Sequence, residues 1–458
     1  MKHRHESADL TGRPGWGTAV LLGTLIIMAF LICPPFGRAS DTSPAAAPGS
    51  RVLTLDQVLA IAAEKNRDIE KAREYIAWAQ GRYVEERAAA LPQLTAIGSL
   101  VRDRDESQKI YSPMQTERTD RRSAQITLTQ PLYTWGQISA AIRAAKAGLK
   151  SASEQLRLYR QAALRDVSAA FYDVLLVREL HALALQNLDQ KHRHAEEAQR
   201  KYQAGVATDY DVLAAAVSAD NARPEAIRTE HQIRTARERL RFLLALTEEV
   251  DAQGDLEAAP GPVPGFGESF ALARERRPDL ADLRYRVAIF QEQVLLAGAQ
   301  DKPRVDFQGA YGWNYLEQPS VYGDGPSWSV GVQLSYPFFD GLRARGRVTQ
   351  ARSDLKRLQI DEATQADAIA LDVRNALNAL TEAQGILRAL AGTMAQAERL
   401  LSMAERGFSL GVKTRLEVED AELNLREAKS SLNRARRDVL VARVNLDWVT
   451  GVLGEKSR

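Results

Sequence analysis

Four long stretches of the chain repeat apolar residues with the period of an α-helix and contain few glycines or prolines. They are rich in Ala, Leu, Arg, Glu and Gln, and they cover residues 140–202, 209–246, 343–406 and 415–449. The pattern predicts long helices. At a rise of about 1.5 Å per residue, the first helix would be roughly 90–100 Å long. Its apolar stripe needs partner helices, so we expect supercoiled or bundled hairpins.

The period changes from about 3.6 to 2 in four shorter segments between the helical stretches. Apolar residues alternate with polar or small ones at about 93–101, 123–132, 305–313 and 327–336. Each segment has about the length that a tilted strand needs to cross a membrane. The alternation, with aromatic residues near the strand ends, is typical of an outer-membrane barrel. A soluble β-hairpin with one buried face would show the same alternation.

The chain is an internal duplication. Residues 201–213 read KYQAGVATDYDVL, and residues 407–419 read GFSLGVKTRLEVE. Other residues of the two copies are separated by the same distance along the chain. Pro131, for example, is as far from Pro337 as Gly205 is from Gly411. A repeat of this length indicates two large, pseudo-symmetric units. We place the first repeat at 51–246, a linker at 247–267, the second repeat at 268–451 and a C-terminal tail at 452–458.

Residues 1–39 have the features of a cleavable export signal: basic residues, an apolar run and a small-residue site that ends at Ala39. The apolar run is shorter than the ~20 residues that span a bilayer, which disfavours an uncleaved anchor. Residues 40–50 have the composition of a flexible linker. The only cysteine, Cys33, follows Ile32, where a lipid-attachment site prefers a small residue. Lipidation of Cys33 stays open.

The composition disfavours several other function classes. A net charge of +2 offers no basic field for nucleic acid. After the signal no apolar run is long enough for a transmembrane helix, so a mature protein inserted in a membrane must be a closed β-barrel. No phosphate-binding glycine loop, nucleophile elbow or paired-cysteine motif occurs, and we expect no enzyme activity and no cofactor. His192 and His194 point to different sides of a helix, which favours solvated surface over a metal site.

Paired features of the two repeats resemble the TolC family of outer-membrane efflux channels across essentially the whole mature chain. They are segments that open a helix (66–69 and 277–280), enter a strand (91–92 and 302–303), leave a strand (130–133 and 336–341) and form a turn (205–206 and 411–412). Their order, pairing and spacing make the match specific. Arg67 departs from the pattern, because the family usually has proline there, whereas Pro278 keeps it.

The resemblance implies a homotrimer that is mostly α-helical with a transmembrane β-barrel. Four strands per chain would form a twelve-stranded barrel in the outer membrane, since four strands alone cannot close around a lumen. Long helical hairpins would continue it as a periplasmic tunnel, whose closed tip meets a periplasmic adaptor and an inner-membrane pump. The protein would then be a passive exit duct for efflux or type I secretion, whose cargo (drugs, metal ions or polypeptides) stays open. The alternative is a soluble periplasmic coiled-coil scaffold.

The two repeated turns are candidate contacts for the adaptor. Each contains a glycine that permits the positive φ of a helix C-cap, a threonine placed to cap the next helix, and an apolar valine. These residues are Gly205, Val206, Thr208, Gly411, Val412 and Thr414. A plain helical turn, in which the valines only staple two helices, is the alternative.

Acidic residues just past the turns are candidates for the periplasmic aperture. By resemblance, Glu417, Asp420 and Asp211 match positions that line it, and threefold symmetry would gather them into a constriction that favours cations. However, Thr414 with Glu417 also reads as a capping box, so Glu417 could serve the helix terminus instead.

Basic and acidic residues in the same turns are candidates for closing the tip. We predict that Lys413, Arg415 and Asp209 make the inter-hairpin salt bridges that keep it shut.

Overall fold

The computed structural model describes residues 51–105, 117–257, 261–318 and 321–454. The predicted signal peptide at 1–39, with Cys33, and the linker at 40–50 lie outside these residues, as does the end of the predicted C-terminal tail. No helix in the described part of the chain is long and apolar enough to cross a bilayer.

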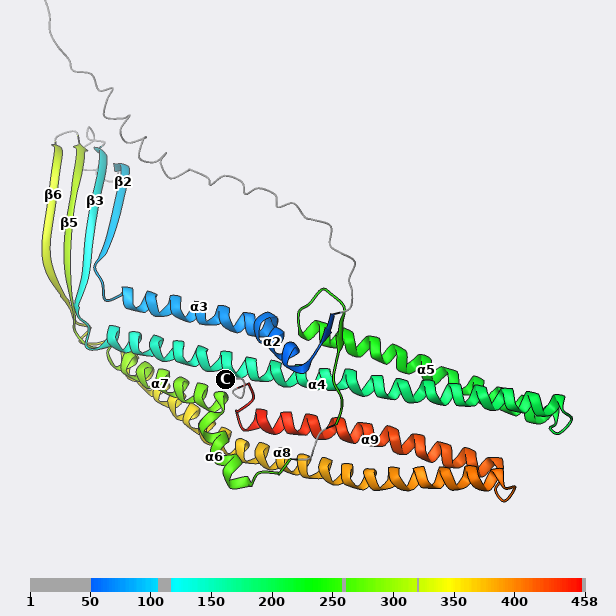
Figure 1. Ribbon diagram of the computed structural model, residues 1–458. Helices are drawn as coiled ribbons and strands as arrows, with labels where there is room; N and C mark the ends of the chain where they lie inside the picture. Colours follow the sequence, from blue (N-terminus) through cyan, green and yellow to red (C-terminus); the bar gives the residue numbers. More distant parts are fainter. Residues whose placement is uncertain (1–50, 106–116, 258–260, 319–320, 455–458) are drawn as a thin grey trace, which may run out of the picture. The chain divides into compact units, whose positions relative to one another are not determined.

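The described chain contains the same series of elements twice (Figure 1). The first series is α2 (Leu55–Lys65), α3 (Arg67–Ala88), β2 (Gln93–Asp105), β3 (Glu117–Tyr133), α4 (Gln137–Gln203) and α5 (Asp209–Leu243). The second is α6 (Phe266–Arg276), α7 (Pro278–Gly298), β5 (Arg304–Gln318), β6 (Val321–Ser335), α8 (Arg343–Ser409) and α9 (Arg415–Val449). Both α4 and α8 have 67 residues, and both α5 and α9 have 35. The predicted duplication and the mostly helical fold are therefore confirmed.

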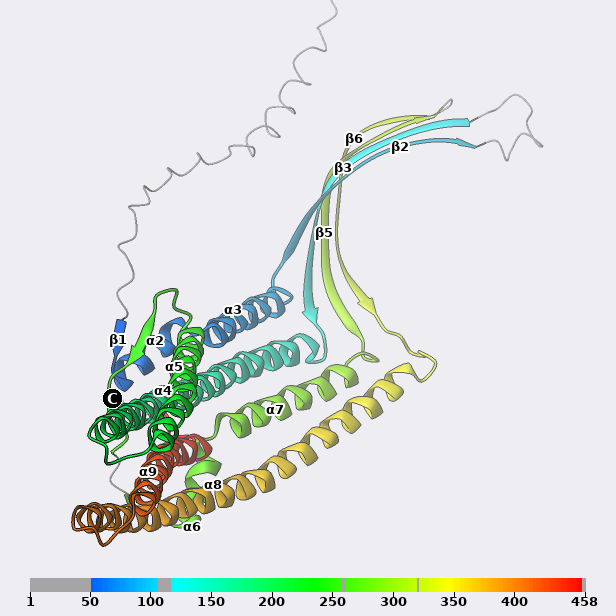
Figure 2. The same ribbon diagram turned by 90° about the vertical axis from the view of Figure 1, so that its right-hand side faces the viewer.

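Strands from both repeats form one antiparallel sheet in the order β2-β3-β5-β6 (Figure 2). The repeats meet at its centre, where β3 pairs with β5. The strands run further toward the joining loops than the alternation predicts, because charged residues pair across them. Arg102 lies 2.8 Å from Asp120, and Arg121 lies 3.8 Å from Asp103. Opposite charges on facing strands extend the ladder beyond the point where the apolar residues stop.

The two faces of the sheet differ in polarity. Successive rows of one face hold Leu94, Leu128, Gly309 and Val330, and then Ala96, Ile126, Tyr311 and Trp328. Most of these side chains are exposed: Trp328, for example, is 76% exposed. The other face is mostly polar or small, with exceptions such as Ile97 and Leu316, and has hydrogen bonds across strands such as the 2.6 Å bond that Gln308 donates to Gln333. The sheet therefore presents a continuous apolar surface on one side and a polar surface on the other.

Neighbouring helices contact one another in a fixed order. Near the sheet the order is α3, α4, α7, α8 (Figure 2). Toward the far ends of the long helices, α5 packs on α4, α9 packs on α8, and α4 contacts α9. The hairpins α4–α5 and α8–α9 thus lie side by side, with their turns at the end of the helices opposite to the sheet (Figure 1).

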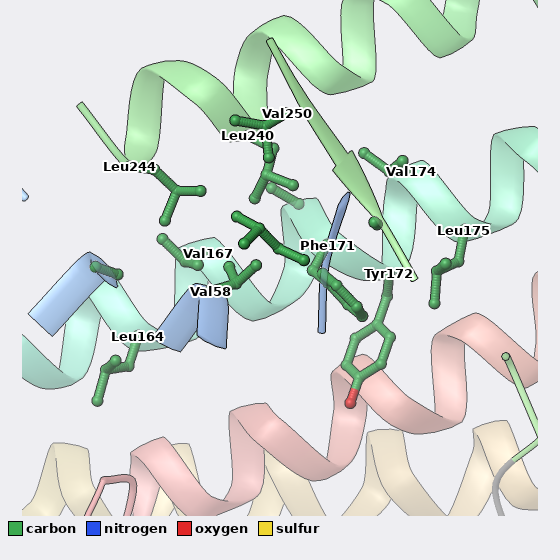
Figure 3. Close-up of a cluster of buried hydrophobic side chains, with 14 of the residues drawn as sticks. Val58, Leu164, Val167, Phe171, Tyr172, Val174, Leu175, Leu240, Leu244 and Val250 are labelled. Carbon is green, nitrogen blue, oxygen red and sulfur yellow. The ribbon is translucent and has the colours of Figure 1, made fainter. Parts of the chain in front are cut away.

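The main hydrophobic cores lie midway along the long helices. In the first repeat, α2, α4 and α5 contribute Val58, Phe171 and Leu240 to a cluster that also contains Val250 (Figure 3). A second cluster around Ile369, Val373 and Leu380 of α8 occupies the corresponding place in the second repeat. Val250 belongs to β4 (Val250–Ala252), which pairs in parallel with β1 (Arg51–Leu53). The sequence pattern does not reveal this small sheet, because three residues are too few for a period to be visible.

Candidate functional site at the hairpin tips

The two hairpin turns share one backbone geometry. Gly205 and Gly411 have φ values of 76° and 74°, in the left-handed region that glycine adopts without strain. The next N–H, that of Val206 or Val412, donates to a carbonyl in the last turn of the preceding helix, at 2.9 Å and 2.8 Å. This is a Schellman cap, which satisfies carbonyls that the helix end leaves free.

Each turn leads into a capping box. The Thr208 hydroxyl accepts the N–H of Asp211, whose carboxylate accepts the N–H of Thr208 at 2.9 Å. The second turn repeats this exchange between Thr414 and Glu417, with 2.8 Å for the bond back to Thr414. Both threonines occupy the capping position that the sequence indicates, and both turns are tightly fixed.

The three candidate aperture carboxylates differ in their bonding. Lys413, on the same hairpin, contacts Glu417 and, together with the Thr414 N–H, lowers the pKa of Glu417 to about 2. The Thr208 N–H and hydroxyl lower the pKa of Asp211. Asp420 is exposed and has no hydrogen bond or ion pair with any residue of the described ranges. Asp420 is therefore the one of the three whose charge is uncommitted within the described chain.

The predicted closing residues find partners within their own chain. Lys413 pairs with Glu417, and Arg415 pairs with Glu419 at 3.0 Å. Asp209 accepts only the adjacent N–H of Tyr210 among the described residues. The inter-hairpin salt bridges that would keep the tip shut stay a prediction.

Six apolar side chains that are at least 66% exposed surround the two turns, and we call them the tip collar. Val206 and Val412 are its predicted members, at 74% and 77% exposed. The structure adds four residues that the sequence analysis missed, which brings the collar to Val206, Tyr210, Leu213, Leu410, Val412 and Leu416. Their common signal was an apolar residue within one helical turn of a predicted hairpin tip. Apolar side chains gathered on an exposed surface are typical of a protein interface.

A charged cluster joins the two hairpins behind the tips. Glu422 of α9 is only 8% exposed and lies 3.5 Å from Lys191 and 3.4 Å from His194, both on α4. The other ring nitrogen of His194 contacts Arg415 at 2.9 Å. The interpretation of His194 as solvated surface was wrong, because α9 covers one side of this part of α4. His192 is exposed.

Polar contacts also join α4 to α9 further from the tip. Arg437 pairs with Asp173 at 2.6 Å, and Arg426 bonds to Asn187. The apolar cluster nearest the tip is small and is built within the second hairpin, around Val418 and Ala421. In the described ranges no group of three or more His, Cys, Asp or Glu side chains is arranged to hold a metal ion.

A family model described as outer membrane efflux protein matches residues 58–246 and 270–452, one segment in each repeat. The chain belongs to this efflux family.

Individual relatives agree with this assignment. Outer membrane protein OprJ of Pseudomonas aeruginosa is 27% identical over 447 residues, which cover 90% of the efflux chain and 90% of OprJ. Protein CyaE of Bordetella pertussis is 31% identical over 256 residues, about half of each protein (54% and 53%). The solved outer-membrane channel OprN superposes with a TM-score of 0.74 at 20% identity, over 91% of the efflux chain and 98% of OprN, so it supports the fold.

The family resolves the alternatives that the sequence left open. The efflux chain is an outer-membrane exit duct, and the soluble coiled-coil scaffold is not supported. The uncovered apolar face of the sheet agrees, because a scaffold hairpin would have to bury Trp313 and Trp328, which are both exposed. The family and its solved relative are channel proteins rather than enzymes.

Proposed function

We propose that three copies of this chain close a twelve-stranded barrel in the outer membrane and continue it as a helical tunnel into the periplasm. The observation that carries the proposal is the sheet. One of its faces is apolar and largely exposed, and the outer edges of β2 and β6 pair with no described strand. Unpaired strand edges are not tolerated in lipid, so neighbouring chains must supply the missing pairs. The polar face, with Gln308 and Gln333, then lines the lumen.

Asp420 supplies the main charge of the periplasmic aperture in this proposal. Glu417 and Asp211 are held in capping boxes, and Lys413 compensates the charge of Glu417. Asp420 lies on α9, as Glu417 does, and is exposed and unpaired among the described residues. Three such carboxylates around an axis would attract cations and repel anions.

The tip collar is the surface that we assign to the periplasmic adaptor, which would link the duct to an inner-membrane pump. Its six apolar residues surround two turns of the same backbone geometry, so both hairpins of each chain offer an adaptor similar contacts. A wide, water-filled duct leaves the choice of cargo to the pump, and both efflux and type I secretion fit this arrangement.

Ion selectivity in a planar bilayer tests the proposal. We expect the purified protein to form cation-selective channels, and Asp420→Asn to reduce the cation-to-anion permeability ratio severalfold. Asp220→Asn is the matched control, because Asp220 is an exposed aspartate on α5 beyond the turns; it should leave the ratio unchanged. Failure to insert would contradict the duct itself. If Asp420→Asn inserts and has the same cation-to-anion permeability ratio as the wild type, the aperture charge must come from another residue.

A further inference from the structure

Near the sheet, the two repeats meet inside the chain through one pair of helices and one pair of strands. Within the chain, α4 and β3 of the first repeat meet α7 and β5 of the second. By the duplication, α8 and β6 are the counterparts of α4 and β3, and α3 and β2 are the counterparts of α7 and β5. These four counterparts are the edges left open by the orders α3, α4, α7, α8 and β2-β3-β5-β6.

We infer that a second copy of this chain adds its α3 and β2 to α8 and β6 in the register that joins the repeats internally, setting Lys356 against Glu74 of the neighbouring chain. The inference rests on the proposed trimeric duct, and it specifies which residues meet where the subunits join.

The helix register rests first on Lys150 and Tyr285. Lys150 Nζ lies 5.7 Å from the centre of the Tyr285 ring, across the contact of α4 with α7. Lys150 is the fourteenth residue of α4, and the fourteenth residue of α8 is Lys356. Tyr285 is the eighth residue of α7, and the eighth residue of α3 is Glu74. The counterpart pair has opposite charges, and neither Lys356 nor Glu74 has a hydrogen bond or ion pair within the described ranges.

A second contact gives a second pair of opposite charges. Gln155 donates to Asp282 at 3.3 Å across the same internal contact. Counted along the helices in the same way, their counterparts are Asp361 of α8 and Lys71 of α3. Lys71 also bonds to Asp68 of its own chain, but both side chains are largely exposed and can share partners.

One counterpart contact is less favourable. Ser151 bonds to Asp282 internally, and its counterpart Arg357 would lie near Lys71 of the neighbouring chain. Arg357 is paired with Asp354 of its own helix at 3.3 Å, and Asp361 lies one turn away, so carboxylates offset the repulsion.

Glycines on the open edges point to the same contact. A Cβ added to Gly81 in α3 or to Gly346 in α8 would meet no heavy atom within 4 Å. Glycine in a helix costs about 1 kcal/mol relative to alanine, and packing within the described chain gives no reason for it here. Inside the chain, Arg143 of α4 pairs with Glu292 of α7. The counterpart of Glu292 is Gly81 of α3, and the counterpart of Arg143 is Thr349 of α8. Small residues thus replace a long ion pair, which lets helices of two chains approach closely.

The strands give an independent match. Leu128 faces Gly309 where β3 pairs with β5. Leu334 is the counterpart of Leu128, because each lies the same number of residues before the long helix of its repeat. Gly98 is the counterpart of Gly309, because they are the sixth residues of β2 and β5. The register therefore places Leu334 opposite Gly98 of the neighbouring chain, a leucine against a glycine in both interfaces. Leu334 is 66% exposed within the chain.

Disulfide formation between strands tests the register. In full-length protein with Cys33→Ala, the pair Gly98→Cys and Leu334→Cys should give covalent trimers on oxidation, because directly opposed strand residues have Cα atoms about 4.5–5.5 Å apart. The matched control replaces Leu334→Cys by Val330→Cys, on the same strand and face but four residues further. A shift of roughly 13 Å along the strand is too long for a disulfide. Efficient cross-linking of the control and not of the test pair would overturn the register.

A charge exchange tests the helices without cysteines. Glu74→Lys and Lys356→Glu should each increase the dissociated fraction of the detergent-solubilised trimer severalfold, and the combined variant should restore it. A combined variant as dissociated as the single ones would refute the pairing. Native mass separates this result from failure of the duct: a wild-type chain that never forms trimers contradicts the proposed function, whereas trimers without the rescue contradict only the register.

Discussion

Ala245 and Gly451 occupy the same position in the two repeats, directly after the C-cap residues of α5 and α9, and both have a left-handed backbone with φ values of 51° and 76°. In each repeat the residue donates its N–H back into the helix end, to Phe242 at 3.1 Å and to Trp448 at 3.0 Å. Only the second repeat has glycine there. A Cβ on Gly451 would lie 2.8 Å from the backbone of Arg276, which excludes any larger residue without movement.

We predict that Ala245→Gly stabilises the protein and Gly451→Ala destabilises it. Alanine in the left-handed region costs about 1–2 kcal/mol, and part of the gain is offset by the freer unfolded chain, so we expect about 0.5–1 kcal/mol from Ala245→Gly. Gly451→Ala should lose at least about 2 kcal/mol, because strain and overlap with Arg276 add. Urea unfolding of the purified protein followed by circular dichroism measures both. A lower midpoint for Ala245→Gly would contradict the prediction.

The capping box at Glu417 should make the second tip sensitive to acid. Its pKa is lowered from 4.5 to about 2, so the ionised form is stabilised by folding. That stabilisation is complete above the unfolded pKa and is lost as the pH falls from about 4.5 through 2. The protection of the Thr414 and Glu417 amides against hydrogen exchange, relative to the intrinsic exchange rate at each pH, should therefore fall as the pH is lowered over this range. In Glu417→Gln the side-chain oxygen can still accept the Thr414 N–H but does not titrate, so the acid dependence of the protection should disappear at this turn; persistence of the same dependence would assign it to another group.

The link between Glu422 and Lys191 should be worth more than a surface ion pair. Both side chains are mostly covered, at 8% and 15% exposed, and Glu422→Ala leaves the lysine without its anion. We expect a loss of about 3 kcal/mol, at the lower end of the cost of breaking a buried pair, because neither side chain is fully buried. Glu197→Ala is the matched control, because its pair with Lys201 is exposed and should contribute less than about 1 kcal/mol. Equal losses in the two variants would show that burial at the hairpin junction adds nothing.

The sequence predicts most of this fold because its signals are periodic and occur twice. Long helices between 137 and 449 follow from a 3.6-residue period sustained over many turns, and the sheet faces follow from strict alternation in segments such as 327–336. The turns were found because Gly205 and Gly411 recur in matching contexts.

Contacts between distant residues with no periodic signal could not be predicted in this way. Glu422 and Lys191 are separated by 231 positions, and nothing local to either residue indicates the other. Tyr210 and Leu213 look like ordinary members of a helical stripe until the structure places them at an exposed tip. For Glu417, by contrast, the sequence allowed two roles, aperture lining and helix capping. The hydrogen bonds of the structure were needed to establish the capping box with Thr414.

Adjacent residues of β6 allow the two faces of the sheet to be tested with the same substitution. Val332 lies on the apolar face and is 63% exposed, whereas Gln333 lies on the polar face and bonds to Gln308. Val332→Arg would put a guanidinium against lipid, at a cost of about 2–4 kcal/mol near the bilayer midplane. Gln333→Arg would put the same group into a water-filled lumen, with little effect on folding but a lower cation conductance. We therefore expect Val332→Arg to reduce the amount of folded protein that resists urea extraction from outer membranes, and Gln333→Arg to leave it unchanged. If Gln333→Arg were the variant that fails to insert, the faces would be reversed, and equal insertion of both would mean that neither face contacts lipid.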